Sequence, residues 1–358
     1  MTDKKQKIHI EGHKLMYHVD EVSRWLKGEI VAPPYVEIGL INSCNHNCVF
    51  CALDYLKNKG SAIDKDVLID NLKDMAEFGV KSVMFAGEGE PLMYPYISEA
   101  VKKAKEFGLD IAITTNGSQL SEEKTKSILK YLSWIKFSID AGTKEKHAKI
   151  HGCSEEDFPK LISNIKFACN YRKENHINCK IGCQMLLLRE NINEVESLIR
   201  IVKEAGVDYI VLKPYSQHPD SINKQWINLN EYDTHLINLS KKYSTDAFQV
   251  IYRDITFKEI EKEGIEYEIC YGINFITIID ALGNVVPCNL FHEKKEFYYG
   301  NINQNSFSDI WKGKGRNEIL KKLYKKGCSG CRKGCRMNFV NKYLYSLKNK
   351  NIEHINFI

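Results

Sequence analysis

The chain has 358 residues, enough for one large domain and a smaller one, and its 43% hydrophobic and 27% charged residues are ordinary for a globular protein. The net charge of +5 is spread along the chain, which argues against a nucleic-acid-binding stripe, and no apolar run is long enough to span a bilayer. The first residues, Met1 to Lys7, lack the apolar core of a signal peptide, so we expect a cytoplasmic protein with neither a membrane nor a nucleic-acid partner.

From about residue 36 onward, apolar runs alternate with amphipathic segments. The strand-like runs are Val36–Ile41, Ser82–Ala86, Asp110–Thr115, Trp134–Ile139, Lys180–Leu188 and Tyr209–Pro214. Strands that alternate with helices predict an α/β fold with a parallel sheet, and βα units of this size can form a partial (β/α)6 barrel of the TIM type. In such folds the chemistry lies at the carboxyl ends of the strands.

After about residue 220 this rhythm changes. Phe275 to Cys288 holds two apolar runs separated by Gly283-Asn284, which predicts a β-hairpin, and a lysine-rich helical segment follows. We therefore expect five regions. They are an N-terminal extension (1–35), the barrel (36–222), a helical connection (223–265), a small module of β-hairpin plus helix (266–340) and a C-terminal tail (341–358).

The twelve cysteines are unusual for a chain expected in a reducing compartment, where clustered thiols usually bind metal. Cys44, Cys48 and Cys51 follow the first strand with the spacing C-x3-C-x2-C. Three thiolates on one loop can hold three irons of a [4Fe-4S] cubane and leave the fourth iron without a protein ligand. A zinc ion would need a fourth ligand, and His46 lies inside the loop, where reaching the same ion is awkward.

This loop, with Phe50 just before its last cysteine, resembles the cysteine loop of the radical S-adenosylmethionine (SAM) superfamily, and the resemblance extends over residues 36 to about 216. It implies that SAM chelates the open iron and that reductive cleavage of SAM yields a 5′-deoxyadenosyl radical, which abstracts hydrogen from a substrate. It also implies an electron donor such as flavodoxin or ferredoxin. In that scheme the protein supplies orientation and excludes water.

Further positions resemble the SAM contacts of that family. Gly87-Glu88-Gly89-Glu90-Pro91 is similar to the family's Gly-Gly-Glu-Pro motif, except that Glu88 stands in place of the first glycine. The glycines would let the backbone approach SAM, and Glu90 would accept hydrogen bonds from its ammonium group. The polar residues at the strand ends that resemble ribose and carboxylate contacts are Asn116, Ser138, Asp140 and Gln184. Asn116 and Asp140 could equally be ordinary turn or cap residues.

A second cysteine set lies near the C-terminus. Cys270, then Gly283-x4-Cys288, then Cys328-x2-Cys331-x3-Cys335 resemble the shortened SPASM module called a twitch domain, which holds one auxiliary [4Fe-4S] cluster. Five cysteines are available for at most four positions. The resemblance favours Cys270, Cys288, Cys331 and Cys335, with Cys328 as a spare or a replacement. A structural zinc site at Cys328, Cys331 and Cys335 is the alternative.

Candidate substrate contacts follow the sixth strand. Lys213, Tyr215, Gln217 and His218 offer several donors to a polar, hydroxyl-rich or phosphorylated ligand, although a solvated loop would look similar.

Cys183 could donate hydrogen to a substrate radical, as an epimerase requires, if its side chain faces the interior. A small buried hydrophobe is the commoner role for such a cysteine, and the same holds for Cys153, Cys169 and Cys179.

Together these features predict an enzyme that abstracts hydrogen from a small polar molecule, such as a sugar, a nucleotide sugar or an aminocyclitol, and so catalyses oxidation, epimerisation or elimination. A peptide-modifying maturase is the first alternative, and the extension of about 35 residues is short for a peptide-recognition domain. A non-catalytic iron–sulfur redox sensor is the second, but a sensor would need neither Glu90 nor the polar strand ends.

Overall fold

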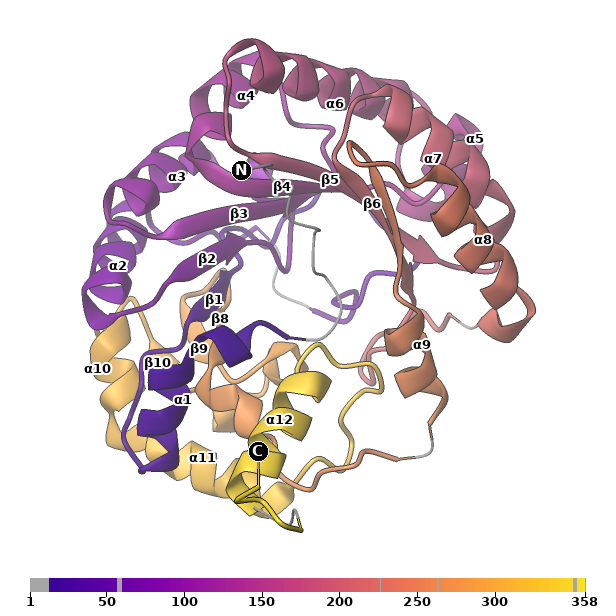
Figure 1. Cartoon of the computed structure of the whole chain (residues 1–358). Helices are drawn as coiled ribbons and strands as arrows, with labels where there is room; N and C mark the ends of the chain where they lie inside the picture. Colours follow the sequence, from indigo (N-terminus) through magenta and orange to yellow (C-terminus); the bar gives the residue numbers. More distant parts are fainter. Residues whose placement is uncertain (1–12, 57–59, 226, 263, 350–352, 358) are drawn as a thin grey trace.

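The computed structural model describes residues 13–56, 60–225, 227–262, 264–349 and 353–357. Within these residues one curved ten-stranded sheet runs in the order β10-β9-β8-β1-β2-β3-β4-β5-β6-β7, with helices along its outer side (Figure 1). Neighbours from β8 to β7 pair in parallel, whereas β8, β9 and β10 pair antiparallel. The strands are β1 (Tyr35–Ile38), β2 (Ser82–Phe85), β3 (Asp110–Thr115), β4 (Leu132–Ser138), β5 (Lys180–Leu187), β6 (Tyr209–Pro214), β7 (Gln249–Tyr252), β8 (Ile276–Ile279), β9 (Asn284–Val286) and β10 (Gly300–Asn301).

Local sequence signals set the helix ends. The Asp64 side chain accepts hydrogen bonds from the N–H groups of Asp66 and Val67 and so starts α2, and Gly79 ends it with a φ of 114°, which a side chain would disfavour. The helices are α1 (Val19–Leu26), α2 (Lys65–Phe78), α3 (Ile97–Glu106), α4 (Glu122–Ile128), α5 (Lys144–His151), α6 (Asp157–Glu174), α7 (Val195–Glu204), α8 (Asp233–Tyr243), α9 (Asp254–Glu261), α10 (Phe307–Lys312), α11 (Lys314–Lys326) and α12 (Asn338–Asn349).

The register of the strands decides which side chains face inward. Phe137 of β4 lies against the helices, because an added methyl at Gly117 would contact both Phe137 and Leu161 of α6. Its neighbours Lys136 and Ser138 therefore point to the concave side of the sheet, which we call the inner face. The helix-facing side is the core, with Ile113, Phe137 and Ile181 among its fully buried members.

The expected parallel α/β fold and the six predicted strands are confirmed, with small differences at their ends. The first strand ends at Ile38, three residues early, and Ile41 instead forms an isolated bridge with Ala62. The segment 223–265 is more than a helical connection, because it contains β7 between α8 and α9. This short strand was missed since it spans only four residues at the sheet edge.

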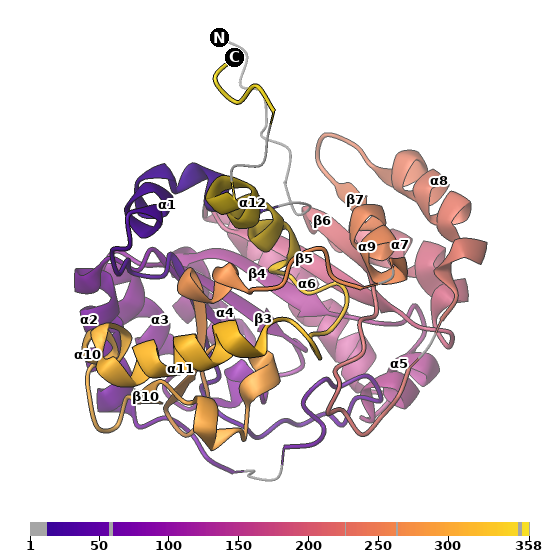
Figure 2. The ribbon, with the colours of Figure 1, turned by 90° about the horizontal axis from the view of Figure 1, so that it is seen from below.

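The predicted hairpin is also confirmed, as Ile278 pairs with Val286 across β8 and β9. Its surroundings differ from expectation, because β8 pairs in parallel with β1 and thus continues the barrel sheet. Residues 341–349 belong to α12 and are not a tail. Helices α1 and α12 lie at one end of the barrel (Figure 2), where Val22 and Leu344 share a second apolar core.

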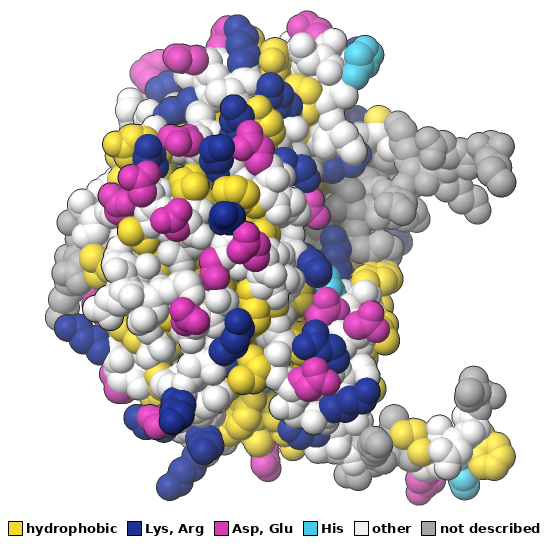
Figure 3. Space-filling model, turned by 90° about the vertical axis from the view of Figure 1, so that its left-hand side faces the viewer, with side chains coloured by type: hydrophobic (Ala, Val, Ile, Leu, Met, Phe, Trp, Pro, Cys, Tyr) yellow, Lys and Arg dark blue, Asp and Glu magenta, His cyan; other side chains and the backbone are white. Residues whose placement is uncertain are grey.

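The surface is mixed in charge. On the face shown in Figure 3, Lys and Arg side chains are interspersed with Asp and Glu, as expected for a solvated surface. Among the described residues, no helix combines the length and apolarity that a bilayer crossing requires.

Candidate functional site

The loop that carries Cys44, Cys48 and Cys51 follows β1 and is fastened to the end of β3. Asn116 donates from Nδ2 to Asn45 Oδ1 at 2.9 Å, and Asn45 donates from its own Nδ2 to Ser118 Oγ at 2.8 Å. The His46 N–H donates to Cys44 Sγ at 3.4 Å. The side-chain amide of Asn116 is therefore bonded within the chain, and it positions the cysteine loop.

The Gly87–Pro91 segment packs directly on this loop. The Glu90 N–H donates to Ser43 O at 3.0 Å. A methyl group added at Gly89 would lie 2.3 Å from Ser43 O and 2.4 Å from Ile41 O, closer than any real contact. Glycine is thus required at 89 for the motif to reach the cysteine loop.

The Glu90 carboxylate is only 2% exposed and accepts three hydrogen bonds. Its Oε1 accepts from Thr115 Oγ1 at 2.5 Å and from the Leu92 N–H at 3.0 Å, and its Oε2 accepts from the Asn116 N–H at 2.8 Å. Burial raises the pKa of this carboxyl group, while these donors act in the opposite direction. Glu90 therefore joins the motif to the end of β3. A hydrogen bond from SAM would be a fourth one accepted by this carboxylate.

Glu88, the departure from the family motif, contacts the C-terminal region. Its Oε1 lies 3.0 Å from His292 Nδ1, and its Oε2 accepts from the Ala281 N–H at 3.4 Å. Asp280 lies close by, and the three side chains Glu88, Asp280 and His292 gather within 4.8 Å. The carboxylate at position 88 thus links the motif loop to the hairpin.

A buried histidine group, which the sequence analysis missed, stands behind Cys48. His151 Nδ1 lies 3.4 Å from Cys48 Sγ, and its Nε2 lies 3.1 Å from Asp140 Oδ2. His147 stacks on His151 with ring centroids 4.1 Å apart, and Phe50 meets the His151 ring edge-on at 5.4 Å. The spacing of four residues between His147 and His151 on α5 was the available signal.

The polar residues at the ends of β4 and β5 have two different roles. Asp140 is buried, accepts from the Leu186 N–H at 2.5 Å and orients His151, so it acts within the chain. Ser138 and Gln184 are paired in register on the inner face, and Gln184 Oε1 accepts from Lys136 Nζ at 3.0 Å. Ser138 and Gln184 are thus positioned to reach a ligand inside the barrel.

The remaining substrate candidates separate into two groups. Lys213 is partly exposed on the inner face, and Tyr215 follows it. Gln217, in contrast, donates to His218 O and Asn223 O, and His218 is fully buried with Nε2 3.1 Å from Asn289 O. Both side chains therefore hold their own loop together. The full burial of His218 corrects the substrate role expected for it, whereas the role expected for the partly exposed Gln217 stays a prediction.

Cys183 lies on the wrong side of the sheet to meet a substrate. It pairs in register with helix-facing Phe137, is fully buried and shares the core with Cys169 of α6. The condition for a hydrogen donor, a side chain facing the interior, is not met. Cys183 is a core residue, as are Cys169 and Cys179.

The C-terminal cysteines converge around one site. Burial raises the pKa of the Cys288 thiol, and the neighbouring thiols of Cys335, Cys270 and Cys331 raise it further. The Met337 N–H donates to Cys335 Sγ at 3.4 Å, and Asn341 Nδ2 donates to Cys270 Sγ at 3.2 Å. Such N–H donors are what thiolate ligands of a cluster accept.

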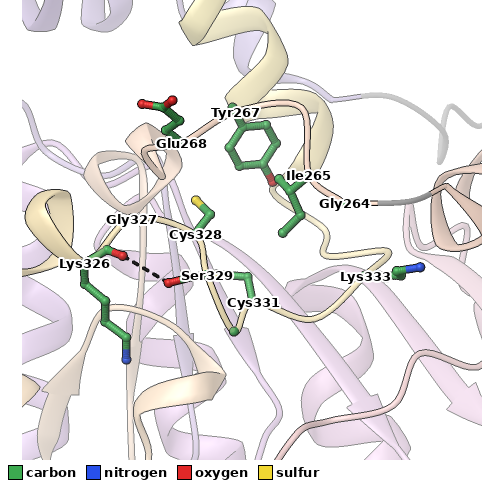
Figure 4. A pocket seen from close by; sticks show the side chains of 11 residues that line it. Gly264, Ile265, Tyr267, Glu268, Lys326, Gly327, Cys328, Ser329, Cys331 and Lys333 are labelled. Atoms are coloured by element: carbon green, nitrogen blue, oxygen red, sulfur yellow. Dashed lines mark hydrogen bonds between the residues drawn. The ribbon is translucent and has the colours of Figure 1, made fainter.

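A pocket of about 510 Å³ adjoins this site. Cys328, Cys331, Tyr267 and Lys326 line it, and Ser329 Oγ donates to Lys326 O at 3.2 Å in its wall (Figure 4). The Cys328 N–H donates to Glu268 O at 2.8 Å, which holds the cysteine segment against the chain that leads to Cys270.

Compact groups of possible metal ligands among the described residues do not consist of the loop thiols alone. In the described part of the chain, no trio within 4.8 Å combines the three N-terminal loop thiols, and none combines thiols of the C-terminal set. His46 groups instead with Cys48 and His151, and its Nε2 lies 3.3 Å from Asp157 Oδ2.

Comparisons with known proteins agree with this geometry. Residues 38–202 match the radical SAM superfamily, and residues 270–336 match an iron–sulfur cluster-binding domain named SPASM. The tungsten-containing aldehyde ferredoxin oxidoreductase cofactor-modifying protein of Pyrococcus furiosus is 25% identical over 301 residues, which cover 77% of this chain and 80% of that one. A probable GTP 3′,8-cyclase of Sulfurisphaera tokodaii is 25% identical over 284 residues, 76% of this chain and 86% of that one.

Among solved structures, Streptococcus suis SuiB bound to SAM has the same fold. Its TM-score is 0.64 at 18% identity, and the match covers 86% of this chain and 72% of SuiB. The cysteine loop at the carboxyl end of β1, the convergent second cysteine set and these matches lead to one assignment. The chain belongs to the radical SAM enzyme superfamily and carries a C-terminal SPASM iron–sulfur-binding domain.

Proposed function

We propose that this enzyme abstracts a hydrogen atom from a small polar substrate, such as a sugar, a nucleotide sugar or an aminocyclitol, and so catalyses its oxidation, epimerisation or elimination. The observation that carries the proposal is the set of polar side chains on the inner face of the barrel. Ser138, Gln184 and Lys213 lie there, on β4, β5 and β6. Membership of the superfamily implies SAM and [4Fe-4S] clusters as cofactors.

When bound, the cofactors supply the radical chemistry, and the chain's own residues position and shield it. Cys44, Cys48 and Cys51 would hold the first cluster. The Asn45–Asn116 bond fixes their loop, and Gly89 allows the motif loop to lie close to it. Ser138 and Gln184 would then contact SAM or substrate, and Lys213 and Tyr215 would contact the substrate.

For the auxiliary cluster we favour Cys270, Cys288, Cys331 and Cys335 as ligands. The electrostatic neighbours of Cys288 are the other three members of this set. The pKa of Cys328 is raised by Cys331 first, then by burial and by Cys270 and Cys335, so Cys328 lies among the same thiols, and its exclusion from the ligand set rests on the family resemblance.

The test is 5′-deoxyadenosine formation by the anaerobically reconstituted protein supplied with SAM and dithionite. The wild type should form it, and Cys48→Ala should form none while keeping its auxiliary iron. Cys183→Ala is the matched control, because it removes a buried thiol from the helix side and should retain both the clusters and the product. Absence of product from the wild type, or its persistence in Cys48→Ala, would contradict the proposal.

A peptide substrate is the second candidate. It is favoured by the likeness in fold to SuiB, which has also been solved with its precursor peptide SuiA. Membership of an enzyme superfamily favours catalysis over the redox-sensor alternative. Small polar molecules and peptides can be compared by which of them raises the rate of 5′-deoxyadenosine formation.

A further inference from the structure

Basic side chains reach the inner face from two separate parts of the chain. Lys136 of β4 and Lys213 of β6 come from the barrel wall, on the same side of the sheet as Gln184 and Leu186. Arg332 and Arg336 come from the segment that also carries Cys331 and Cys335. A wall and a covering segment thus contribute positive charge to one space.

The covering segment is fixed at both of its ends. At one end, Ser216 Oγ, just beyond β6, donates to Lys333 O, and at the other Arg336 Nη1 lies 2.5 Å from Glu37 Oε2 on β1. Arg332 directly precedes the first of these anchors, Lys333.

Glu37 is the carboxylate that acts electrostatically on Lys136, but it is already paired with Arg336 and also accepts from Tyr35 Oη at 3.2 Å. In the described part of the chain, no carboxylate lies within 4.0 Å of the Lys136, Lys213 or Arg332 cations. Lys136 donates to the neutral amide of Gln184 and lies over the ring of Trp134. Three partly buried cations therefore face the interior without a carboxylate.

Such an arrangement is costly unless an anion completes it, because buried charges in proteins are normally paired. The electrostatic cost is expressed in the pKa of Lys213. Burial, followed by the neighbouring cations Arg332, Lys136 and Arg253, lowers the pKa of Lys213 well below its ordinary range. Ionisable side chains that a stable fold keeps with a strongly shifted pKa are typical of binding sites.

We infer that Lys136, Lys213 and Arg332 form a site for a phosphate or diphosphate group of the substrate. This inference rests on the proposed function and narrows its substrate class to phosphorylated small molecules. Several cations match a group with two or more negative charges better than a single carboxylate does, and the guanidinium of Arg332 suits bidentate contact with phosphate oxygens.

The experiment is calorimetric titration of the cluster-loaded protein with pyrophosphate, inorganic phosphate or glutarate at constant ionic strength. SAM is present throughout, so that the carboxylate of SAM already occupies its own contacts. Pyrophosphate should bind at least about tenfold more tightly than glutarate, a dicarboxylate. Lys213→Met and Lys136→Met should each weaken pyrophosphate binding at least about tenfold.

Lys180→Met is the matched control, because Lys180 begins β5 with its side chain 57% exposed and should leave the affinity unchanged. Iron content and thermal midpoint check folding, and removal of a buried charge should not lower the midpoint. If one lysine variant fails to fold, the other decides. The inference is overturned if glutarate binds as tightly as pyrophosphate, if nothing binds, or if a folded variant of either lysine binds like the wild type.

Failure of this inference is distinct from failure of the proposed function. A wild type that forms 5′-deoxyadenosine but binds no pyrophosphate retains its function and loses the phosphate site. A protein that binds pyrophosphate more tightly than glutarate but forms no 5′-deoxyadenosine retains the phosphate site and loses the proposed function.

Discussion

Glu88 Oε1 lies 3.0 Å from His292 Nδ1, and both side chains are almost fully buried. This contact joins the Gly87–Pro91 segment to the chain that follows Cys288, within the SPASM domain. The carboxylate at position 88 thus connects two regions that are far apart in the sequence.

Glu88→Gln should lower the free energy of unfolding by about 1–3 kcal/mol, because a buried charged acceptor is removed and its partner stays in place. Chemical denaturation of the anaerobic protein measures this. Glu77→Gln is the control, since Glu77 is 69% exposed and its loss should change stability by less than about 0.5 kcal/mol. A double variant with His292→Ala should show coupling. Equal effects of Glu88→Gln and Glu77→Gln would mean that the contact does not stabilise the fold.

Gly89→Ala should weaken SAM binding at least about tenfold, because the new methyl would overlap Ser43 O and Ile41 O and force the motif away from the cysteine loop. Equilibrium binding of SAM to the cluster-loaded protein is the measurement. Gly315→Ala in α11 is the control, as its methyl would lie 3.6 Å from Tyr299 O, an ordinary contact. Unchanged affinity in Gly89→Ala would show that the loop tolerates a side chain.

Cys328→Ala should retain the auxiliary cluster, and Cys331→Ala should lose it, because Cys331 belongs to the set that surrounds Cys288. Both changes are best made in a Cys48→Ala background, so that the iron and sulfide measured come from the auxiliary site alone. If Cys328→Ala instead lost the auxiliary cluster and Cys331→Ala retained it, Cys328 would be the ligand and Cys331 the supporting residue.

Lys136 gives a pH-dependent prediction. Burial, together with Arg253 and Arg336, lowers its pKa from 10.5 to about 8. Between these values the unfolded chain binds more protons than the folded one, so this residue's contribution to stability rises with pH, and its unfavourable effect is complete below about pH 8.

Lys136→Met removes this effect. The variant should therefore exceed the wild type in urea midpoint most clearly near pH 7, and the difference should shrink towards about pH 9.5. Lys180→Met provides the baseline for loss of an exposed lysine. A midpoint difference that stays constant over this range would show that Lys136 does not titrate with a lowered pKa.

The local part of the fold could be predicted from sequence because it depends on near neighbours. Apolar alternation located β3 and β6 at their observed bounds, and Gly283-Asn284 located the β8–β9 turn. The spacing of Cys44, Cys48 and Cys51 likewise predicts the first cluster loop, since three thiolates so close in the chain can share one site. These signals lie within a few residues of one another.

The tertiary structure alone decided what meets across the barrel. The parallel pairing of β8 with β1 brings His292 to Glu88 and Arg336 to Glu37. The register of β5 and β6 places Lys213 on the inner face, while a local hydrogen-bond network retains Gln217 and His218 in their loop. The physical reason is that these contacts join segments far apart in the chain, and no local pattern records which distant segment completes a buried charge.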